Sequence, residues 1–207
     1  MRGSIQKARL ASIGLGTGTL ASYGEPGQEI TFYDIDPAVK RIASNPAYFT
    51  YLTDCRATVK IVLGDARLRL QEAPDNADRI IFVDAFSSDA IPVHLITKEA
   101  IELYIRKLSP HGILAVHVSN RCLDLEQVLG NLADSLNLAS RAQYDDDLDL
   151  DIQPGKYRSH WVVLARNEAD LGTLAKDDRW TPVERNPAVG VWTDDYSNLL
   201  GVFRWEN

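Results

Sequence analysis

Two acidic and two hydroxyl side chains follow an apolar run of the kind that forms a buried strand. Residues 80–83 are apolar, and Asp84, Ser87, Ser88 and Asp89 come directly after them. Polar groups at the carboxyl end of a parallel strand usually face a ligand. We therefore interpret Asp84, Ser87 and Asp89 as a candidate reaction centre for chemistry on a small molecule.

A glycine-rich stretch follows the first predicted strand. Gly14, Gly16 and Gly18 alternate with larger residues, among them Thr17. Glycine lets the backbone turn sharply and approach a ligand closely. A dinucleotide fingerprint would have Gly or Ala at position 19, where this chain has Thr, so the spacing favours a nucleoside over a pyrophosphate.

Acidic residues also end the second and third predicted strands. Asp34 lies about 20 residues after Gly14, where a carboxylate can accept hydrogen bonds from both ribose hydroxyls. Asp65 stands where it could accept from an adenine amino group, or it could cap the following helix. With their neighbours Ile35 and Ala66, these acids complete the predicted nucleoside site.

Strand-like and helix-like patterns alternate along the first two thirds of the chain. The predicted strands are residues 8–13, 29–33, 58–63, 79–83 and 112–118, and the predicted helices are 19–23, 37–43, 66–72, 97–108 and 123–136. Two further strands, 140–144 and 160–165, resemble an antiparallel pair that closes the sheet. The expected fold is α/β and Rossmann-like: a doubly wound, mostly parallel seven-stranded sheet with an antiparallel closing strand.

Composition limits the function classes. The 207 residues have 45% hydrophobic content, which predicts a single domain over 1–207. The net charge of -7 argues against a nucleic-acid partner and suits a cationic small molecule. Cys55 and Cys122 have no CxxC spacing, so we expect neither a disulfide nor a metal site.

Cellular location is predicted from the same features. No apolar run approaches the roughly 20 residues that span a bilayer, so we expect no membrane insertion of this chain. Because few cysteines suit a reducing compartment, we expect a cytoplasmic location. The cytosolic domain of a membrane-anchored protein is the alternative.

Six segments together resemble a known family: residues 13–21, 33–37, 64–67, 84–95, 117–121 and 192–196. They look like the class I fold of S-adenosylmethionine-dependent enzymes. They are most similar to the spermidine synthase family, in particular to the spermidine-synthase-like domains often fused to a membrane transporter-like region. The resemblance extends over nearly the whole chain.

The resemblance implies transfer of an aminopropyl group from decarboxylated S-adenosylmethionine to putrescine or a similar polyamine, with release of methylthioadenosine. Asp84 matches the catalytic aspartate of the family, while Asp89 or Ser87 would hold the amine. Deprotonating an alkylamine of pKa near ~10 at pH 7 costs on the order of 4 kcal/mol, and a carboxylate can take that proton. The sulfonium leaving group is already activated, so no metal is expected. A homodimer is a possible assembly.

Three differences from the patterns of these enzyme families leave the donor and the activity open. Thr17 stands where the synthases usually carry an aspartate that contacts the aminopropyl amine. Ser12 stands where methyltransferases often place an acid for the methionine amine. The amino-terminal β-lobe of the family is absent from this sequence. A methyltransferase of small molecules using S-adenosylmethionine, and a non-catalytic nucleoside or polyamine sensor of a membrane protein, are therefore the alternatives.

The aromatic tail supplies the candidate acceptor site. Trp192, Asp194, Asp195 and Tyr196 combine aromatic rings with acids, which suits an alkylammonium ligand, although they could equally cap the tail.

Two other features carry weaker functional predictions. His117 could line the cleft or be a core histidine. The acidic loop 145–151 could attract polyamines or chelate calcium, but loops of this kind are usually solvated, and we favour that reading.

Overall fold

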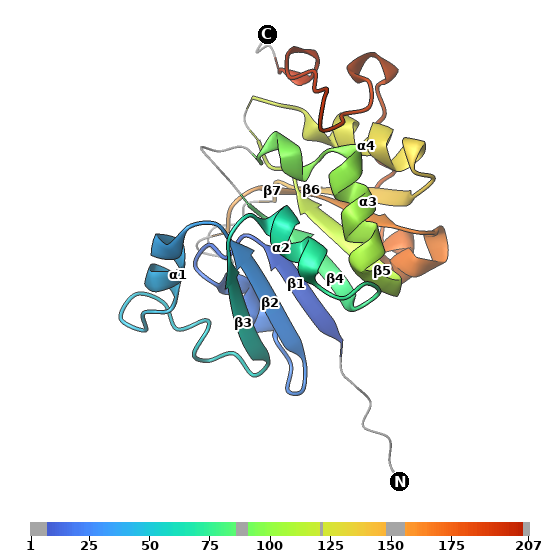
Figure 1. Ribbon diagram of the computed structural model, residues 1–207. Helices are drawn as coiled ribbons and strands as arrows, with labels where there is room; N and C mark the ends of the chain where they lie inside the picture. Colours follow the sequence, from blue (N-terminus) through green and yellow to red (C-terminus); the bar gives the residue numbers. More distant parts are fainter. Residues whose placement is uncertain (1–7, 86–90, 121, 148–155, 205–207) are drawn as a thin grey trace. The chain divides into compact units, whose positions relative to one another are not determined.

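A seven-stranded mixed sheet organises the chain (Figure 1). The computed structural model describes residues 8–85, 91–120, 122–147 and 156–204. The strands are β1 (Arg9–Ile13), β2 (Glu29–Asp34), β3 (Thr58–Leu63), β4 (Asp78–Val83), β5 (Leu108–His117), β6 (Ala139–Asp145) and β7 (Ser159–Ala165), in the order β3-β2-β1-β4-β5-β7-β6. β1 pairs in parallel with β2 and β4, as β2 does with β3, whereas β7 is antiparallel to β5 and β6. The predicted fold class is confirmed.

The contacts of the chain divide it into two compact units. The first unit contains the chain up to Ala85 together with Arg106–Gly112, and the second contains the remaining residues. The expectation of a single domain over 1–207 stays a prediction, and each unit is described by itself below.

In the first unit, helices α1 (Pro37–Ala43) and α2 (Ala66–Glu72) and the 3-10 helix η1 (Thr19–Tyr23) connect the strands. α1 begins at Pro37 because Asp36 accepts a hydrogen bond from the Ala38 N–H at 2.7 Å, and Pro suits the first helical position. In Figure 1, α2 lies in front of the strands of this unit. Leu10 of β1 and alternating residues of β2 form the core on which η1 and α1 pack; the buried members of this cluster are Leu10, Leu15, Ala21, Ile30, Phe32 and Ala43.

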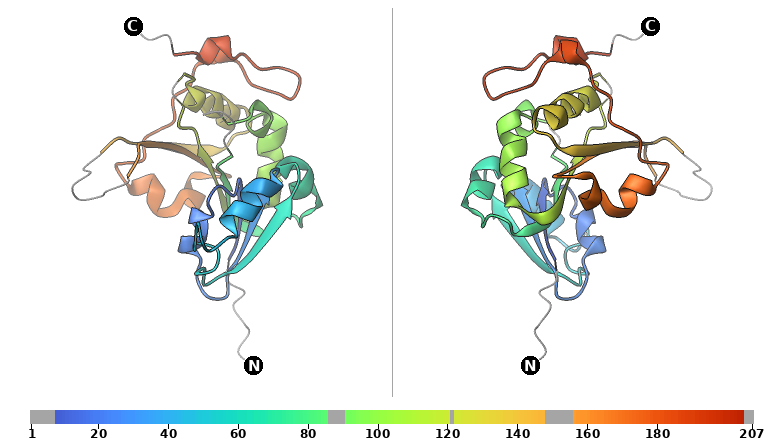
Figure 2. Two further views of the ribbon diagram at one scale, coloured as in Figure 1. Left: turned by 90° about the vertical axis from the view of Figure 1, so that its left-hand side faces the viewer. Right: turned by 90° about the vertical axis from the view of Figure 1, so that its right-hand side faces the viewer.

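In the second unit, the main helices are α3 (Lys98–Lys107, of which the last two residues belong to the first unit) and α4 (Leu125–Ser135). Short 3-10 helices lie at η2 (Val93–Leu95), η3 (Glu168–Lys176), η4 (Pro187–Val189) and η5 (Leu200–Val202). Apolar residues of α4 recur at helical spacing and are buried, namely Leu125, Val128, Leu129 and Leu132. The C-terminal segment, red in Figure 2, lies over α4 and contacts it through η4 and η5.

The predicted elements match the observed ones closely. Helices α1 and α2 and strand β3 have the predicted bounds, and most other ends differ by one or two residues. The largest difference is β5, which begins at Leu108 rather than at residue 112. Its first residues are Leu-Ser-Pro-His-Gly, a composition typical of a turn, so the sequence did not predict a strand there. Within the described residues, no helix has the length and apolar character needed to cross a membrane.

Candidate functional site

Gly14 brings the glycine loop against the end of β4. Its N–H donates to the Tyr33 carbonyl at 2.8 Å, and the Asp84 N–H donates to the Ile13 carbonyl at 2.8 Å. Gly14 has φ of 100°, and a β-carbon there would overlap the carbonyl oxygen of Asp84. Only glycine fits this position, and the predicted nucleoside loop and the predicted catalytic acid are neighbours as a result.

The rest of the loop turns outward through two further glycines. Gly16 and Gly18 have φ of 52° and 84°, in the left-handed region that favours glycine. Gly18 is buried, and a side chain there would press on Leu52, whereas a side chain at Gly16 would point into open space. The Thr17 hydroxyl lies 3.0 Å from that of Thr19. Gly16 is exposed and Thr17 is half-buried, so this side of the loop is partly open.

The half-buried Asp34 ties the end of β2 to the glycine loop. One carboxylate oxygen accepts from the Leu15 N–H at 2.9 Å, and the other accepts from the Asp36 N–H at 2.9 Å. Both partners are backbone groups, and each carboxylate oxygen can accept a second hydrogen bond. The arrangement orients the carboxylate rigidly and can still take hydrogen bonds from a pair of hydroxyls.

The other predicted nucleoside contacts lie at the ends of β2 and β3. Ile35 is 73% exposed, so an apolar surface stands open beside Asp34. Asp65 accepts from the Leu68 N–H at 3.0 Å and is the N-cap of α2, of which Ala66 is the first residue. The capping role that the sequence left open is thus observed. Contact of Asp65 with adenine stays a prediction.

The predicted reaction centre is described only in part. Asp84 follows the last residue of β4 and is exposed, while Ser87 and Asp89 lie outside the described residues. Ser12, the residue at the position of the methyltransferase acid, is buried and donates to the Gly14 carbonyl at 2.9 Å. Its hydroxyl thus supports the glycine loop.

In the second unit, the predicted acceptor residues form a turn against the start of α3. Trp192 is completely buried, and its carbonyl accepts from the Lys98 N–H at 2.9 Å. Asp194 accepts from the Thr97 hydroxyl at 2.7 Å, and its own N–H donates to Glu99 at 2.9 Å. In this structure Trp192 is a packing residue and Asp194 anchors the tail. Their contact with an amine, like that of the exposed Asp195 and Tyr196, stays a prediction.

His117 also makes contacts that support the fold. Its ring stacks on Trp161 with centroids 4.5 Å apart, and Nε2 lies 2.7 Å from the Ser119 hydroxyl. Both interactions hold the ring in place within the second unit, so the reading as a structural histidine accounts for them.

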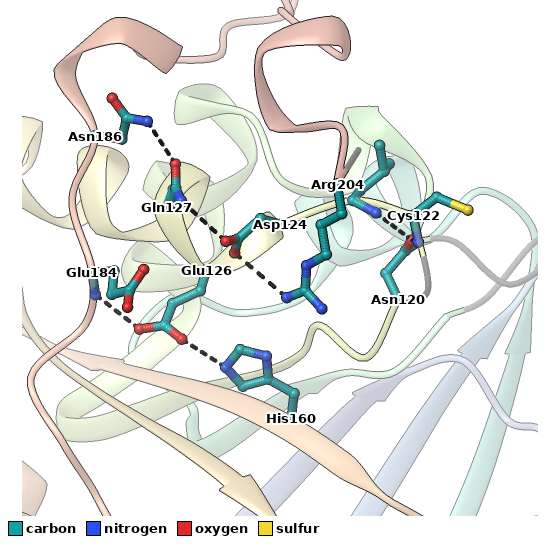
Figure 3. A network of polar contacts seen from close by, with 10 residues as sticks. Asn120, Cys122, Asp124, Glu126, Gln127, His160, Glu184, Asn186 and Arg204 are labelled. Atoms are coloured by element: carbon teal, nitrogen blue, oxygen red, sulfur yellow. Dashed lines mark hydrogen bonds and ion pairs between the residues drawn. The ribbon is translucent and has the colours of Figure 1, made fainter. Parts of the chain in front are cut away.

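Figure 3 shows a polar network around α4 that the sequence did not predict. Glu126 accepts from His160 Nε2 at 2.8 Å and from the Glu184 N–H at 2.8 Å. Burial alone would raise the pKa of Glu126, but the hydrogen bonds from His160 and Glu184 outweigh burial and lower it. Glu126 joins β7, α4 and the C-terminal segment. The only signal for this network in the sequence was an acidic residue on a helix that is otherwise rich in apolar residues.

Across the parts of the chain that the structure describes, no three His, Cys, Asp or Glu side chains gather in a way that could hold a metal ion.

Comparisons with known proteins identify relatives of part of the chain. A polyamine aminopropyltransferase of Vibrio vulnificus (strain CMCP6) is 33% identical over 116 residues, which are 53% of this chain and 37% of that protein. The chain thus matches little more than a third of that relative's length. No family model matches the chain.

Solved structures of two enzyme classes share the fold. A probable spermidine synthase from Corynebacterium glutamicum ATCC 13032 has a TM-score of 0.58 at 17% identity, over 91% of this chain and 72% of its own. A spermidine synthase in complex with the transition-state analogue AdoDATO has a TM-score of 0.56 at 14% identity, over 88% and 64%. The O-methyltransferase TomG from Streptomyces achromogenes, in complex with SAM, has a TM-score of 0.53 at 14% identity, over 78% and 74%. The chain therefore has the fold that spermidine synthases share with S-adenosylmethionine-dependent methyltransferases, and over part of its length its sequence resembles a polyamine aminopropyltransferase.

Proposed function

We propose that this chain is an aminopropyltransferase that moves the aminopropyl group of decarboxylated S-adenosylmethionine to a polyamine such as putrescine. The observation that carries the proposal is the contact between Gly14 and Asp84, which joins a nucleoside-type glycine loop to an exposed carboxylate. The partial identity with a polyamine aminopropyltransferase supports the same reaction.

The donor would bind through its nucleoside. The two ribose hydroxyls would donate to Asp34, whose carboxylate is already oriented by the N–H groups of Leu15 and Asp36. Ile35 offers an exposed apolar side chain for the adenine ring, and Asp65 would accept from the adenine amino group. The sulfonium would then lie near the open side of the glycine loop, at Gly16 and Thr17.

The reaction is a substitution at the methylene carbon bonded to sulfur. The lone pair of the acceptor amine forms the new C–N bond, and the C–S bond breaks with its electron pair going to sulfur, which leaves neutral methylthioadenosine. Asp84 would accept the proton that the amine loses and pass it to solvent. Orientation of the two substrates supplies much of the rate, because the leaving group is already positively charged.

The acceptor would be a diamine held by acids. Ser87 and Asp89 would bind the attacking end, and Asp195 and Tyr196 of the exposed turn would bind the distal ammonium. The chain would act in the cytoplasm, alone or as the cytosolic part of a membrane-anchored protein.

Methyl transfer is the second candidate, and Thr17 is the residue that favours it. Synthases of the resembled family have an aspartate there for the aminopropyl amine, and a threonine offers no charge. The shared fold with an O-methyltransferase that binds SAM is compatible with either reaction.

The deciding experiment is a parallel calorimetric titration with S-adenosylmethionine, its decarboxylated form and methylthioadenosine. We expect the decarboxylated donor to bind more tightly than the intact one, and Thr17→Asp to increase that preference. Tighter binding of the intact donor would replace the proposal by methyl transfer. Binding of methylthioadenosine alone, without turnover of either donor in the presence of putrescine, would favour a sensor.

A further inference from the structure

The C-terminal segment is bound to one face of α4 by polar contacts, most of them partly buried. We call residues 184–196 the C-terminal strap. Within the second unit, it begins at Glu184, which contacts α4, and it reaches the start of α3, where the Trp192 carbonyl accepts from the Lys98 N–H. Three side chains of α4, at positions 126, 127 and 131, and the bare backbone at 130 contact it. Positions 126 and 130, like 127 and 131, are four residues apart, and 127 and 130 are three apart, so these residues form one continuous surface of α4 toward the strap.

Asn131 makes the most contacts with the strap. It is 8% exposed, its Oδ1 accepts from the Asn186 N–H at 3.1 Å, and its Nδ2 donates to the carbonyls of Asn186 at 2.7 Å and Gly190 at 2.9 Å. One side-chain amide therefore satisfies three backbone groups of the strap. No hydrocarbon side chain could replace it without leaving partly buried backbone groups of Asn186 and Gly190 unpaired.

Gly130 allows the close approach that these bonds require. A β-carbon there would overlap the carbonyl oxygen of Glu184. Glu126 adds an acceptor for the Glu184 N–H one helical turn earlier. The strap is therefore held at its first residue as well as at Asn186 and Gly190.

The far end of the strap carries the candidate acceptor residues. Thr193 and Tyr196 exchange backbone hydrogen bonds of 2.8 and 3.2 Å, and the turn they close exposes Asp195 and Tyr196. The Tyr196 ring lies against Gly190, where a β-carbon would meet its Cε1 at 3.5 Å. A chain of contacts thus runs from Asn131 through Gly190 to Tyr196.

We propose that Asn131 is a positioning residue for amine binding: by fixing Gly190 it sets the place of Tyr196 and Asp195. This inference rests on the proposed function, because it assumes that the turn binds the distal ammonium. Asn131 itself touches no substrate. Its effect reaches the amine only through the position of the strap.

Two variants test the inference by different physical routes. Asn131→Leu removes all three hydrogen bonds and keeps the same branching and number of heavy atoms, although leucine is the larger side chain. Gly130→Ala raises the helix propensity of α4 while forcing the strap away, so it displaces the strap without weakening the helix. Asp134→Asn is the matched control, because its salt bridge to Arg185 joins the same helix to the strap but is exposed.

The measurements are the steady-state constants of the transfer reaction and hydrogen exchange of the strap amides. We expect both variants to raise the KM for putrescine about tenfold, as for the loss of one or two buried hydrogen bonds, with little change in kcat or in the KM of the donor. Exchange should become faster in residues 184–196 and stay slow in β7. The control should match the unmodified protein.

The outcomes separate the two proposals. If the unmodified protein turns over and the KM for putrescine is unchanged in both variants, the positioning role is wrong and the proposed function stands. If it does not turn over, the proposed function fails, and calorimetric binding of putrescine decides the inference. Weaker binding in both variants, with faster strap exchange, supports it, whereas equal or absent binding overturns it.

Discussion

Asp34 and Glu126 use the same chemistry in the two units, with different results. Each carboxylate accepts hydrogen bonds with both oxygens and so joins segments far apart in the sequence. Asp34 stands at the carboxyl end of β2, is half-buried, and accepts hydrogen bonds from two backbone N–H groups. Glu126 lies on α4 and pairs with a buried histidine and a strap amide. Each carboxylate oxygen accepts one hydrogen bond in both arrangements, but Asp34 is half-buried beside the glycine loop, whereas the Glu126 side chain is 13% exposed and lies between β7 and the C-terminal segment. The first carboxylate is therefore accessible to a ligand, and the second is enclosed by the fold.

Polar residues alone therefore do not identify a site. In the first unit, the acids at strand ends keep exposed surface next to a glycine loop. In the second, Trp192 and Asp194 are occupied by packing and by Thr97. The surroundings of each side chain, rather than its residue type, distinguish the two.

The largest effect should come from the carboxylate at the reaction centre. Asp84→Asn should lower kcat for aminopropyl transfer by about a hundredfold or more, because a general base is removed, while donor affinity stays nearly unchanged. Steady-state kinetics and calorimetry measure the two quantities. Asp54→Asn, an exposed acid after α1, is the control. Full activity of Asp84→Asn would remove Asp84 from the mechanism.

Loss of the ribose carboxylate should have the next largest effect. Asp34→Ala should weaken methylthioadenosine binding by roughly 2 kcal/mol, about thirtyfold, because hydrogen bonds to a charged group are lost. Calorimetry with the 2′-deoxy analogue tests the assignment, since that analogue should lose less than the parent compound. Equal losses for both ligands would mean that Asp34 supports the loop and does not contact the ribose.

The carboxylate of the second unit should affect stability and its pH dependence. Because the folded pKa of Glu126 is lowered from 4.5, its contribution is complete above that pH and is lost as the pH falls through the lowered folded value. Glu126→Gln should cost about 1 kcal/mol of unfolding free energy near neutral pH and flatten the decline at acidic pH. Urea denaturation at neutral and acidic pH measures the unfolding free energy and its dependence on pH. The same pH dependence in Glu126→Gln and the unmodified protein would contradict the prediction.

The smallest effect should separate the two roles of Asp65. Asp65→Ser keeps a good N-cap for α2, so the unfolding free energy should change by less than about 0.5 kcal/mol. Affinity for methylthioadenosine should fall about fivefold if the carboxylate accepts from adenine. An analogue without the amino group should bind both proteins equally. Unchanged affinity for the parent ligand would leave Asp65 with the cap alone.

The sequence by itself determined the elements and the local framework of the nucleoside site. Strand and helix periods, Pro37 at a helix start and acids after strands act within a few residues, where propensity and capping are decided. The sequence also predicts that Gly14 and Asp84 lie at the same edge of the sheet, because the carboxyl ends of parallel strands meet there, but their direct contact depends on the pairing of β1 with β4.

Only the tertiary structure decided which polar side chains are consumed by the fold. Asn131 reaches Gly190 across 59 positions, and Glu126 reaches His160 across 34. Trp192 is buried by packing and not by any pattern of its neighbours. Such contacts depend on where distant segments meet in space. The local sequence does not predict which distant segments meet, because one side-chain amide can hydrogen-bond to any backbone segment that packs beside it.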